Sequence, residues 1–269
     1  MRNDYNGKAI VITGGTKGIG LATGLSFGRV GAHCYLTNRW GSANEDDVRA
    51  QFKAIGAREP AIVEADVIQD EETEALLDRI AADGHDAVEV FVSNVCVVQP
   101  AKGIDSYKKR SLLKSLEYSA WPFVRYPQLM QEKFNKLPRY IIGISSDGPD
   151  NYFTQYEYVA TSKAVMEVFC RYLVKHLRGE DVRVNVVRTR NVLTDAVEEI
   201  FGADYKRFVG KYAGEEYFIE PHEIGDTVLA LCSGMMDAMS GQVIMVDKGI
   251  AFADTLMRLM ERREALGLE

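Results

Sequence analysis

The chain has few of the residues that mark metal, disulfide or membrane proteins. It holds 4 cysteines and 4 histidines in 269 residues, and neither type forms the closely spaced pairs of a zinc site or a disulfide framework. No apolar run approaches the roughly 18 residues that a membrane span needs, and the start of the chain lacks a signal-peptide pattern. We therefore expect no metal site, buried thiols, surface histidines and a cytoplasmic location.

The sequence also lacks a basic block. Its formal net charge is −7 and its pI is about 5.3, with acidic residues spread along the chain. Nucleic-acid binding needs clustered lysine and arginine, so we expect a small-molecule partner instead. With 46% hydrophobic residues the chain can bury one sizeable core, and no repeat or low-complexity linker divides it. Residues 1–269 are therefore expected to form a single domain.

Short β-rich runs alternate with amphipathic runs of helical length. Apolar residues recur at helical spacing, for example Leu76, Leu77 and Ile80. Continuous apolar strands separated by helices indicate a doubly wound, Rossmann-type α/β fold whose parallel sheet is covered on both faces. Seven runs are expected to be its strands: residues 8–13, 32–37, 61–65, 88–93, 139–145, 182–187 and 241–246.

Two later segments are expected to serve the substrate or the assembly. The longest irregular connection, residues 188–221, is where a substrate lid is expected. The C-terminal extension, residues 250–269, carries Leu256, Leu259 and Met260 at helical spacing, which predicts an extra helix at a subunit contact or, alternatively, a frayed end. Six aromatic residues of the lid could line a slot for an acyl chain or pack the lid against its own domain: Phe201, Tyr205, Phe208, Tyr212, Tyr217 and Phe218.

The first predicted strand runs into the sequence TGGTKGIG, residues 13–20, and then into a helix. Glycines at positions 14, 18 and 20 permit a tight turn and let backbone N–H groups and the helix N-terminus approach a pyrophosphate. Because the loop stands at the first junction of strand and helix, it predicts a dinucleotide site and not merely a connecting turn.

The end of the second predicted strand indicates which dinucleotide binds. An acid there would bind the free ribose 2′-hydroxyl of NADH, but the chain has Asn38 and Arg39 at this point. Lys17 adds a cation in the glycine loop. We expect Arg39 and Lys17 to pair with the 2′-phosphate of NADPH; the alternative is that both are solvated surface cations.

With these features the chain resembles the short-chain dehydrogenase/reductase superfamily from residue 7 to about residue 249. The resemblance rests on TGGTKGIG and on ADV (65–67), SSDG (145–148), VRVN (182–185), LTDA (193–196) and GQVIMVDKG (241–249). It implies a Rossmann fold, catalytic roles for Ser146 and Lys163, and a homo-oligomer, commonly a tetramer. It also implies these cofactor-binding residues: Gly14, Thr16, Lys17, Gly18, Ile19, Gly20, Asn38, Arg39, Asp66, Val67, Asn94, Lys163, Val192 and Thr194.

Several positions depart from the family pattern. Residues 93–96 read S-N-V-C where the family usually reads N-N-A-G, and residues 188–190 read R-T-R in place of a proline-glycine turn. The helix asparagine that commonly completes a proton relay is missing, and Glu117 or Tyr118 stands there instead. The usual tyrosine position, four residues before the lysine, is Val159. A standard carbonyl reductase is not expected to show this combination.

The segment YEYVATSK, residues 156–163, offers another tyrosine. At about 100° per residue, a helix would bring Tyr156 to within roughly 20° of Lys163 and turn Tyr158 roughly 140° away. The Tyr-x6-Lys pair resembles the enoyl-acyl carrier protein reductases of the superfamily, in particular those with a TGxxxGIG-type loop and two tyrosines, here Tyr152 and Tyr156. Tyr152 is the competing proton donor, and a further alternative is that Tyr156 only packs at the mouth of the cleft.

The spacing has a chemical reason. In enoyl-thioester reduction, negative charge develops on an oxygen several bonds from the reduced carbon, so the stabilising hydroxyl must stand farther off than in ketone reduction. We expect an NADPH-dependent reductase of a 2-enoyl thioester on acyl carrier protein or coenzyme A, in fatty acid or polyketide biosynthesis. Tyr156 would stabilise the enolate and Lys163 would hold the ribose. Two alternatives stay open: a carbonyl reductase of a specialised pathway using Tyr156 or Tyr152, and a non-catalytic NADPH-binding protein.

Overall fold

The computed structural model describes residues 4–39 and 44–267. Residues 1–3, 40–43 and 268–269, which fall within the predicted domain and its C-terminal extension, lie outside this description. The seven predicted strands are confirmed as β1 (Ala9–Ile12), β2 (His33–Asn38), β3 (Ala61–Glu64), β4 (Val88–Ser93), β5 (Tyr140–Ser146), β6 (Arg183–Thr189) and β7 (Val243–Val246). The described helices are α1 (Gly18–Gly28), α2 (Glu45–Ala54), α3 (Asp70–Ala82), η1 (Ile104–Ser106), α4 (Lys109–Ser119), α5 (Pro122–Phe134), α6 (Glu157–His176), α7 (Asp195–Phe201), α8 (Tyr205–Tyr212), η2 (Glu215–Tyr217), α9 (Pro221–Leu231) and α10 (Thr255–Glu261).

The strands form one parallel sheet in the order β3-β2-β1-β4-β5-β6-β7. After β3 the chain crosses back and adds β4 on the other side of β1, so that Ile12 lies between Leu36 of β2 and Val92 of β4. In an open parallel sheet, a ligand crevice forms beyond the carboxyl ends of the strands where the order reverses. The predicted Rossmann-type single domain is confirmed, and its topology places such a crevice between β1 and β4.

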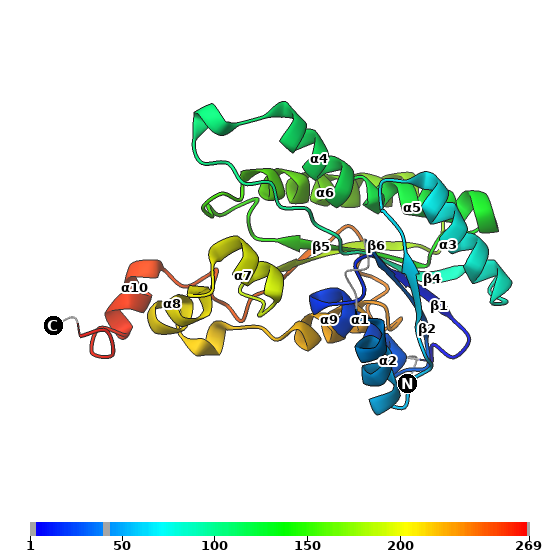
Figure 1. Cartoon of the computed structure of the whole chain (residues 1–269), viewed down its shortest axis with the longest axis horizontal. Helices are drawn as coiled ribbons and strands as arrows, with labels where there is room; N and C mark the ends of the chain where they lie inside the picture. Colours follow the sequence, from blue (N-terminus) through cyan, green and yellow to red (C-terminus); the bar gives the residue numbers. More distant parts are fainter. Residues whose placement is uncertain (1–3, 40–43, 268–269) are drawn as a thin grey trace.

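Helices cover both faces of the sheet (Figure 1). On one face lie α1, α2 and α9, and on the other lie α3, α4, α5 and α6. Side chains alternate along a strand, so β1 sends Ile10 and Ile12 into the first core and Ala9 and Val11 into the second. Because both faces are buried, the strand is apolar throughout. Within the described ranges, no helix has the length and apolarity to cross a bilayer.

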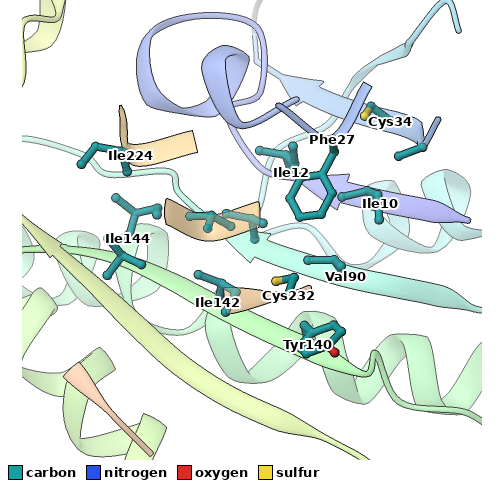
Figure 2. Packing of buried hydrophobic residues seen from close by; sticks show 14 of the residues in the cluster. Ile10, Ile12, Phe27, Cys34, Val90, Tyr140, Ile142, Ile144, Ile224 and Cys232 are labelled. Atoms are coloured by element: carbon teal, nitrogen blue, oxygen red, sulfur yellow. The ribbon is translucent and has the colours of Figure 1, made fainter. Parts of the chain in front are cut away.

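The core between α1, α9 and the sheet contains two of the cysteines. Figure 2 shows Phe27 of α1 beside Ile12, with Cys34 and Cys232 among the surrounding side chains. Cys170 is buried in the second core. Cys96, however, is exposed, so the expectation of buried thiols is wrong at this position. It follows a strand at the ligand crevice, where the chain leaves the sheet.

The connection expected to be irregular is mostly helical. Together with α10, the helices α7 and α8 form one end of the molecule (Figure 1). The extra helix predicted in the C-terminal extension is present as α10. Just beyond it, Arg262 donates hydrogen bonds to the carbonyl oxygens of Gly210 (3.1 Å) and Lys211 (3.2 Å). These bonds fasten the extension to α8.

A buried histidine starts β2, at the end of the sheet away from the crevice. His33 is 5% exposed, so the expectation of surface histidines is wrong here. Its Nδ1 lies 2.9 Å from Nε2 of His85 and 3.0 Å from the hydroxyl of Tyr35. Burial, aided by the positive charge of Arg58, lowers the pKa of His33 from 6.5 to about 4. The folded protein therefore holds this imidazole neutral at pH values where an unfolded chain would protonate it.

This shift predicts a loss of stability in mild acid. Between pH 6.5 and pH 4 the unfolded chain binds a proton at His33 and the folded protein does not, so acidification favours unfolding. By pH 5 the shifted pKa of His33 should have lowered the free energy of unfolding by about 2 kcal/mol. Urea unfolding at pH 7.5 and pH 5 measures it, with His33→Gln as the control that lacks the group. If the free energy of unfolding falls equally between pH 7.5 and pH 5 in the wild type and the variant, the prediction is contradicted.

Candidate active site

A cavity of about 390 Å³ lies beyond the carboxyl ends of the central strands. Its wall includes Gly14 after β1, Asn94 after β4 and Ser146 at the end of β5. Phe201 of α7 and Tyr205 of α8 line it from the lid side. A volume of this size is typical of small-molecule sites, and its place at the reversal of strand order is where a nucleotide-binding crevice is expected.

The glycine loop is shaped for close approach of a phosphate. Gly14 and Gly18 have φ values of 61° and 53°, which glycine adopts without strain. A Cβ on Gly20 would stand 2.2 Å from the carbonyl oxygen of Gly14, so a larger residue does not fit at the start of α1. The amide of Asn94 donates to the carbonyl oxygens of Thr13 (3.0 Å) and Gly14 (3.2 Å), which ties the loop to β4. These residues fit the pyrophosphate of a dinucleotide.

The other predicted cofactor-binding residues surround the same cavity. Gly20 is not among the described residues that line it. The predicted residues that line it are Gly14, Thr16, Lys17, Gly18, Ile19, Asn38, Arg39, Asp66, Val67, Asn94, Lys163, Val192 and Thr194. Thr194 also approaches the glycine loop, because a Cβ on Gly18 would lie 3.4 Å from its methyl group. The segment after β6 therefore comes close to the glycine loop.

Arg39 belongs to a network at the end of β2. Its Nη2 lies 2.8 Å from Oδ2 of Asp66, and its Nη1 donates to the hydroxyl of Tyr118. That hydroxyl donates to the same Asp66 oxygen at 3.1 Å, and the guanidinium carbon lies 5.0 Å from the centre of the Tyr118 ring. Of the two residues offered in place of the missing asparagine, Tyr118 lines the cavity, whereas Glu117 is exposed and is not among the described lining residues.

Ser146, Tyr156 and Lys163 all line the cavity, and Tyr156 is hydrogen-bonded to Ser146. Lys163 is 4% exposed, and its Nζ donates to the carbonyl oxygen of Ile144 at 2.7 Å. Burial, aided by Cys96, raises the pKa of Tyr156 above its ordinary value, and the hydrogen bond with Ser146 opposes that rise. The phenol is thus neutral at physiological pH and able to donate a proton or a hydrogen bond.

The other two tyrosines of this segment lie elsewhere. Tyr152 is 82% exposed and is not among the described residues that line the cavity. Tyr158 is buried, and its hydroxyl accepts a hydrogen bond from the backbone N–H of Lys108 at 2.5 Å. Val159, which stands where the family usually has its tyrosine, is fully buried. The structure therefore brings one tyrosine of the three, Tyr156, together with Ser146.

The helical argument for Tyr156 does not hold in the form that the sequence suggested. Helix α6 begins at Glu157, and Tyr156 precedes it with φ −112° and ψ 4°. Gln155 before it has a φ of 60°, a value that marks a turn. Tyr156 is therefore the N-cap residue of α6, and its carbonyl oxygen accepts a hydrogen bond from the N–H of Ala160 at 2.8 Å. Ideal helical angles do not fix the direction of a side chain at this position.

Two arginines stand where the family has its proline-glycine turn, and they have different surroundings. Arg188 pairs with buried Glu167, with Nη2 to Oε2 at 2.5 Å and Nε to Oε1 at 2.9 Å, and also with Asp150. Arg190 lines the cavity, and its Nη1 lies 3.0 Å from Oδ2 of Asp147. Burial raises the pKa of Asp147, and the charge of Arg190 opposes that rise.

Aromatic rings line the lid side of the cavity. The ring of Phe153 lies 5.6 Å from that of Tyr156 and 6.0 Å from that of Phe201, and the rings of Phe201 and Tyr205 are 4.8 Å apart. Of the six lid aromatics predicted to form a slot, Phe201 and Tyr205 line the cavity. The others are not among the described lining residues, and Phe208 is 62% exposed. The aromatic slot is therefore smaller than expected.

Several lining residues were not predicted as site residues. Val95 and Cys96 replace the small residues of the family's N-N-A-G motif, and that departure was the available signal. Asp147 follows the predicted serine directly, and Phe153 lies in the turn before α6. Four further additions lie in motifs quoted from the sequence: Ala65, Ser145, Thr189 and Asp195. The remaining additions had no sequence signal: Thr37, Val98, Ile144, Asn191 and Val197.

Comparison with known proteins gives one profile match and several distant relatives. The profile described as enoyl-(acyl carrier protein) reductase matches residues 14–251. The chain is 24% identical over 245 residues to the 7alpha-hydroxysteroid dehydrogenase of Escherichia coli (strain K12), with 91% of this chain and 94% of that protein covered. It is also 24% identical over 252 residues to the enoyl-acyl-carrier-protein reductase (NADH) FabI of Aquifex aeolicus (strain VF5), with 90% and 91% covered.

Solved structures share the architecture. A 7 alpha-hydroxysteroid dehydrogenase complexed with NADH and 7-oxo glycochenodeoxycholic acid superposes with a TM-score of 0.80. The alignment covers 92% of this chain and 96% of that chain at 23% sequence identity. At that identity the likeness shows the fold alone.

Proposed function

The chain belongs to the short-chain dehydrogenase/reductase superfamily, within the family described as enoyl-(acyl carrier protein) reductase, and on that premise we propose that it reduces the C=C bond of a 2-enoyl thioester with NADPH. Membership makes it an oxidoreductase that uses a nicotinamide cofactor. The observation that supports the finer proposal is the position of Tyr156, which lies in the cavity with Ser146 and Lys163 while the usual tyrosine position is the buried Val159.

The residues of the site suit this reaction. NADPH, held by the glycine loop and Lys163, would supply the hydride for the β-carbon of the substrate. The electron pair of the C=C bond would move toward the thioester oxygen, and a proton from solvent water would then add at the α-carbon. The Tyr156 hydroxyl, with Ser146 beside it, would donate to that oxygen as its charge develops. Lys163, which is buried and lines the cavity, would hold the nicotinamide ribose and add positive charge. Residues 188–221 would act as the lid, because Phe201 and Tyr205 cover the cavity from that side.

A direct assay tests the proposal. Oxidation of NADPH should be followed with trans-2-butenoyl coenzyme A, with 3-oxobutanoyl coenzyme A and without substrate. Turnover of the enoyl compound at a rate well above that of the ketone supports enoyl reduction. Turnover of the ketone alone would contradict enoyl reduction and indicate a carbonyl reductase. Binding of NADPH without turnover of either would favour a non-catalytic cofactor-binding protein.

A carbonyl reductase is the second candidate, supported by the same pair of hydroxyls. Ser146 and Tyr156 are joined by a hydrogen bond, so both could donate to one ketone oxygen next to the reduced carbon. The distant relative named 7alpha-hydroxysteroid dehydrogenase is consistent with such chemistry. The ketone arm of the assay decides between the two.

The cofactor preference gives a separate prediction. Because Asn38 and Arg39 replace an acid at the end of β2, NADPH should bind at least tenfold more tightly than NADH, a difference of about 1.4 kcal/mol. Arg39→Ala should remove most of this preference. Tyr118→Phe should remove part of it, since the Tyr118 hydroxyl holds the guanidinium. Fluorescence titration of both cofactors measures the dissociation constants. Equal values for the wild type would refute the preference.

We also infer a homo-oligomer, and we expect a tetramer because the family resemblance implies one. Helix α10 and the turn before it leave apolar side chains in water: Phe252 is 98% exposed, Leu256 is 70% exposed and Met260 is 58% exposed. Contiguous exposed apolar residues are typical of surfaces that pair with another chain. Light scattering at micromolar concentration should give a multiple of 30.0 kDa. A mass of one chain would contradict the inference.

A further inference from the structure

Arg190 is built into the cavity wall with one edge of its guanidinium group engaged. Nη1 lies 3.0 Å from Oδ2 of Asp147, and the guanidinium carbon lies 5.5 Å from the centre of the Phe153 ring. Asp147 is 2% exposed, so these contacts fix the direction of the side chain. Among the described residues, the buried Nε of Arg190 has no hydrogen-bond partner.

An unpaired buried donor calls for an explanation. Leaving such a group without an acceptor is unfavourable, and a buried ion pair is by itself weak evidence for stability. The Arg190–Asp147 pair is therefore poorly explained as a device that holds the fold together. Because the Nε atom is closed to the cavity, any contact with a substrate falls to the rest of the guanidinium group, which belongs to a residue of the cavity wall.

The charges of the cavity lining favour one additional negative charge. The described charged residues that line the cavity are four cations, Lys17, Arg39, Lys163 and Arg190, and three carboxylates, Asp66, Asp147 and Asp195. Arg39 is paired with Asp66, and Arg190 with Asp147. The cations exceed the carboxylates by one, so the lining favours an anionic group in the cavity.

Arg190 also lies close to the proposed donor. Both Arg190 and Tyr156 pack against the ring of Phe153, the latter with ring centres 5.6 Å apart. The charge of Arg190 lowers the pKa of Tyr205 against the rise that burial causes, so Arg190 acts across the aromatic side of the cavity as well. The guanidinium group and the ring of Tyr156 thus share one neighbour, Phe153, at the cavity wall.

We propose that Arg190 is a second oxyanion donor of this active site, and that its guanidinium group stabilises the same substrate oxygen as the hydroxyl of Tyr156. This proposal rests on the proposed reduction, because it concerns the oxygen on which negative charge develops. A preorganised donor aimed at developing charge contributes without reorganising during the reaction. Asp147 keeps the arginine in place and offsets part of its charge.

Binding of an oxyanion tests the proposal without turnover. 4-Nitrophenol is titrated into protein saturated with NADP⁺, and bound phenolate is followed by its absorbance. Arg190→Gln should weaken phenolate binding at least tenfold, and Arg190→Lys should restore part of it because the charge returns. Arg207→Gln is the matched control, since Arg207 pairs with Asp204 on the exposed outer side of the lid, where its side chain is 81% exposed. Equal phenolate affinity for Arg190→Gln and wild type would overturn the proposal.

Kinetics on the substrate that the wild type reduces provide the second test. Arg190→Gln should lower kcat by about 30-fold with little change in KM, as expected for a donor that acts in the transition state. NADPH affinity should change by less than about twofold. Combining it with Tyr156→Phe should cost less than the product of the single effects, because both groups meet one oxygen. A rise in KM with unchanged kcat, or fully multiplicative losses, would contradict a shared oxyanion site.

Failure of the proposed enoyl reduction can be distinguished from failure of the proposed role of Arg190. If the wild type reduces the ketone and not the enoyl thioester, enoyl reduction fails, and the Arg190 variants are then measured on the ketone, whose oxygen also gains charge. If the wild type reduces neither, the phenolate titration alone decides the role of Arg190. If the enoyl thioester is reduced and Arg190→Gln matches wild type in both tests, the function stands and the second donor is wrong.

Discussion

Tyr156→Phe is expected to lower the turnover of a 2-enoyl thioester by on the order of 10²-fold or more, the cost of removing one oxyanion donor. The variant loses only the hydroxyl, and the ring keeps its contacts with Phe153 and Phe201. NADPH binding should barely change, because the hydroxyl acts on the substrate. Steady-state kinetics and a cofactor titration on the same preparation measure both effects.

Three variants act as comparisons for this result. Tyr158→Phe should leave turnover nearly unchanged, because its hydroxyl bonds to the backbone of Lys108 outside the cavity. Tyr152→Phe should also be nearly silent, since Tyr152 is 82% exposed. Lys163→Ala should reduce both turnover and NADPH affinity. If Tyr152→Phe abolishes turnover and Tyr156→Phe retains it, the site is right and the proposed donor is wrong.

Arg188→Met is expected to lower the free energy of unfolding by about 3–5 kcal/mol, because it leaves Glu167 as an uncompensated buried charge. Glu167 is 4% exposed and otherwise accepts a hydrogen bond from the hydroxyl of Ser145 at 2.7 Å. One neutral donor does not replace a two-point contact with a guanidinium group. Urea unfolding at neutral pH measures the loss.

A double variant shows whether the loss of unfolding free energy in Arg188→Met comes from the unpaired charge of Glu167 or from lost side-chain packing. Glu167→Leu combined with Arg188→Met removes both charges, and should recover most of the loss, since apolar replacement of a buried pair is often close to neutral. Arg207→Met removes an arginine from an exposed pair and should change stability by less than about 0.5 kcal/mol. A double variant as unstable as Arg188→Met would show that the cost comes from lost packing.

The sheet and the phosphate loop could be predicted because their signals are local. Each strand is a short apolar run between turn residues, and the loop glycines follow the first strand directly. All seven strand predictions were confirmed to within a few residues. The cavity lies where the strand order reverses; the alternation of strands and helices predicted a parallel sheet but not that order.

The partners of the site residues could not be predicted, because they come from distant parts of the chain. Arg39 was expected to be available to a phosphate, yet it meets Asp66 and Tyr118, which arrive from the ends of β3 and α4. The contact between Arg190 and Asp147 likewise joins the ends of two strands. The turn that carries Tyr156 depends on a left-handed residue, Gln155, and sequence spacing alone does not indicate it.

The order of strands in the sheet has a consequence for synthesis on the ribosome. β1 forms early, but its neighbour on one side is β4, with Ile12 opposite Val92 about 80 residues later. At roughly 5–20 residues per second, the edge of β1 waits about 4–16 s for that partner. An unpaired strand edge is a template for pairing with other chains. The nascent chain therefore exposes this edge until β4 has emerged from the ribosome, and chaperone binding should matter most during that period. Release of the chain before β4 emerges should favour aggregation.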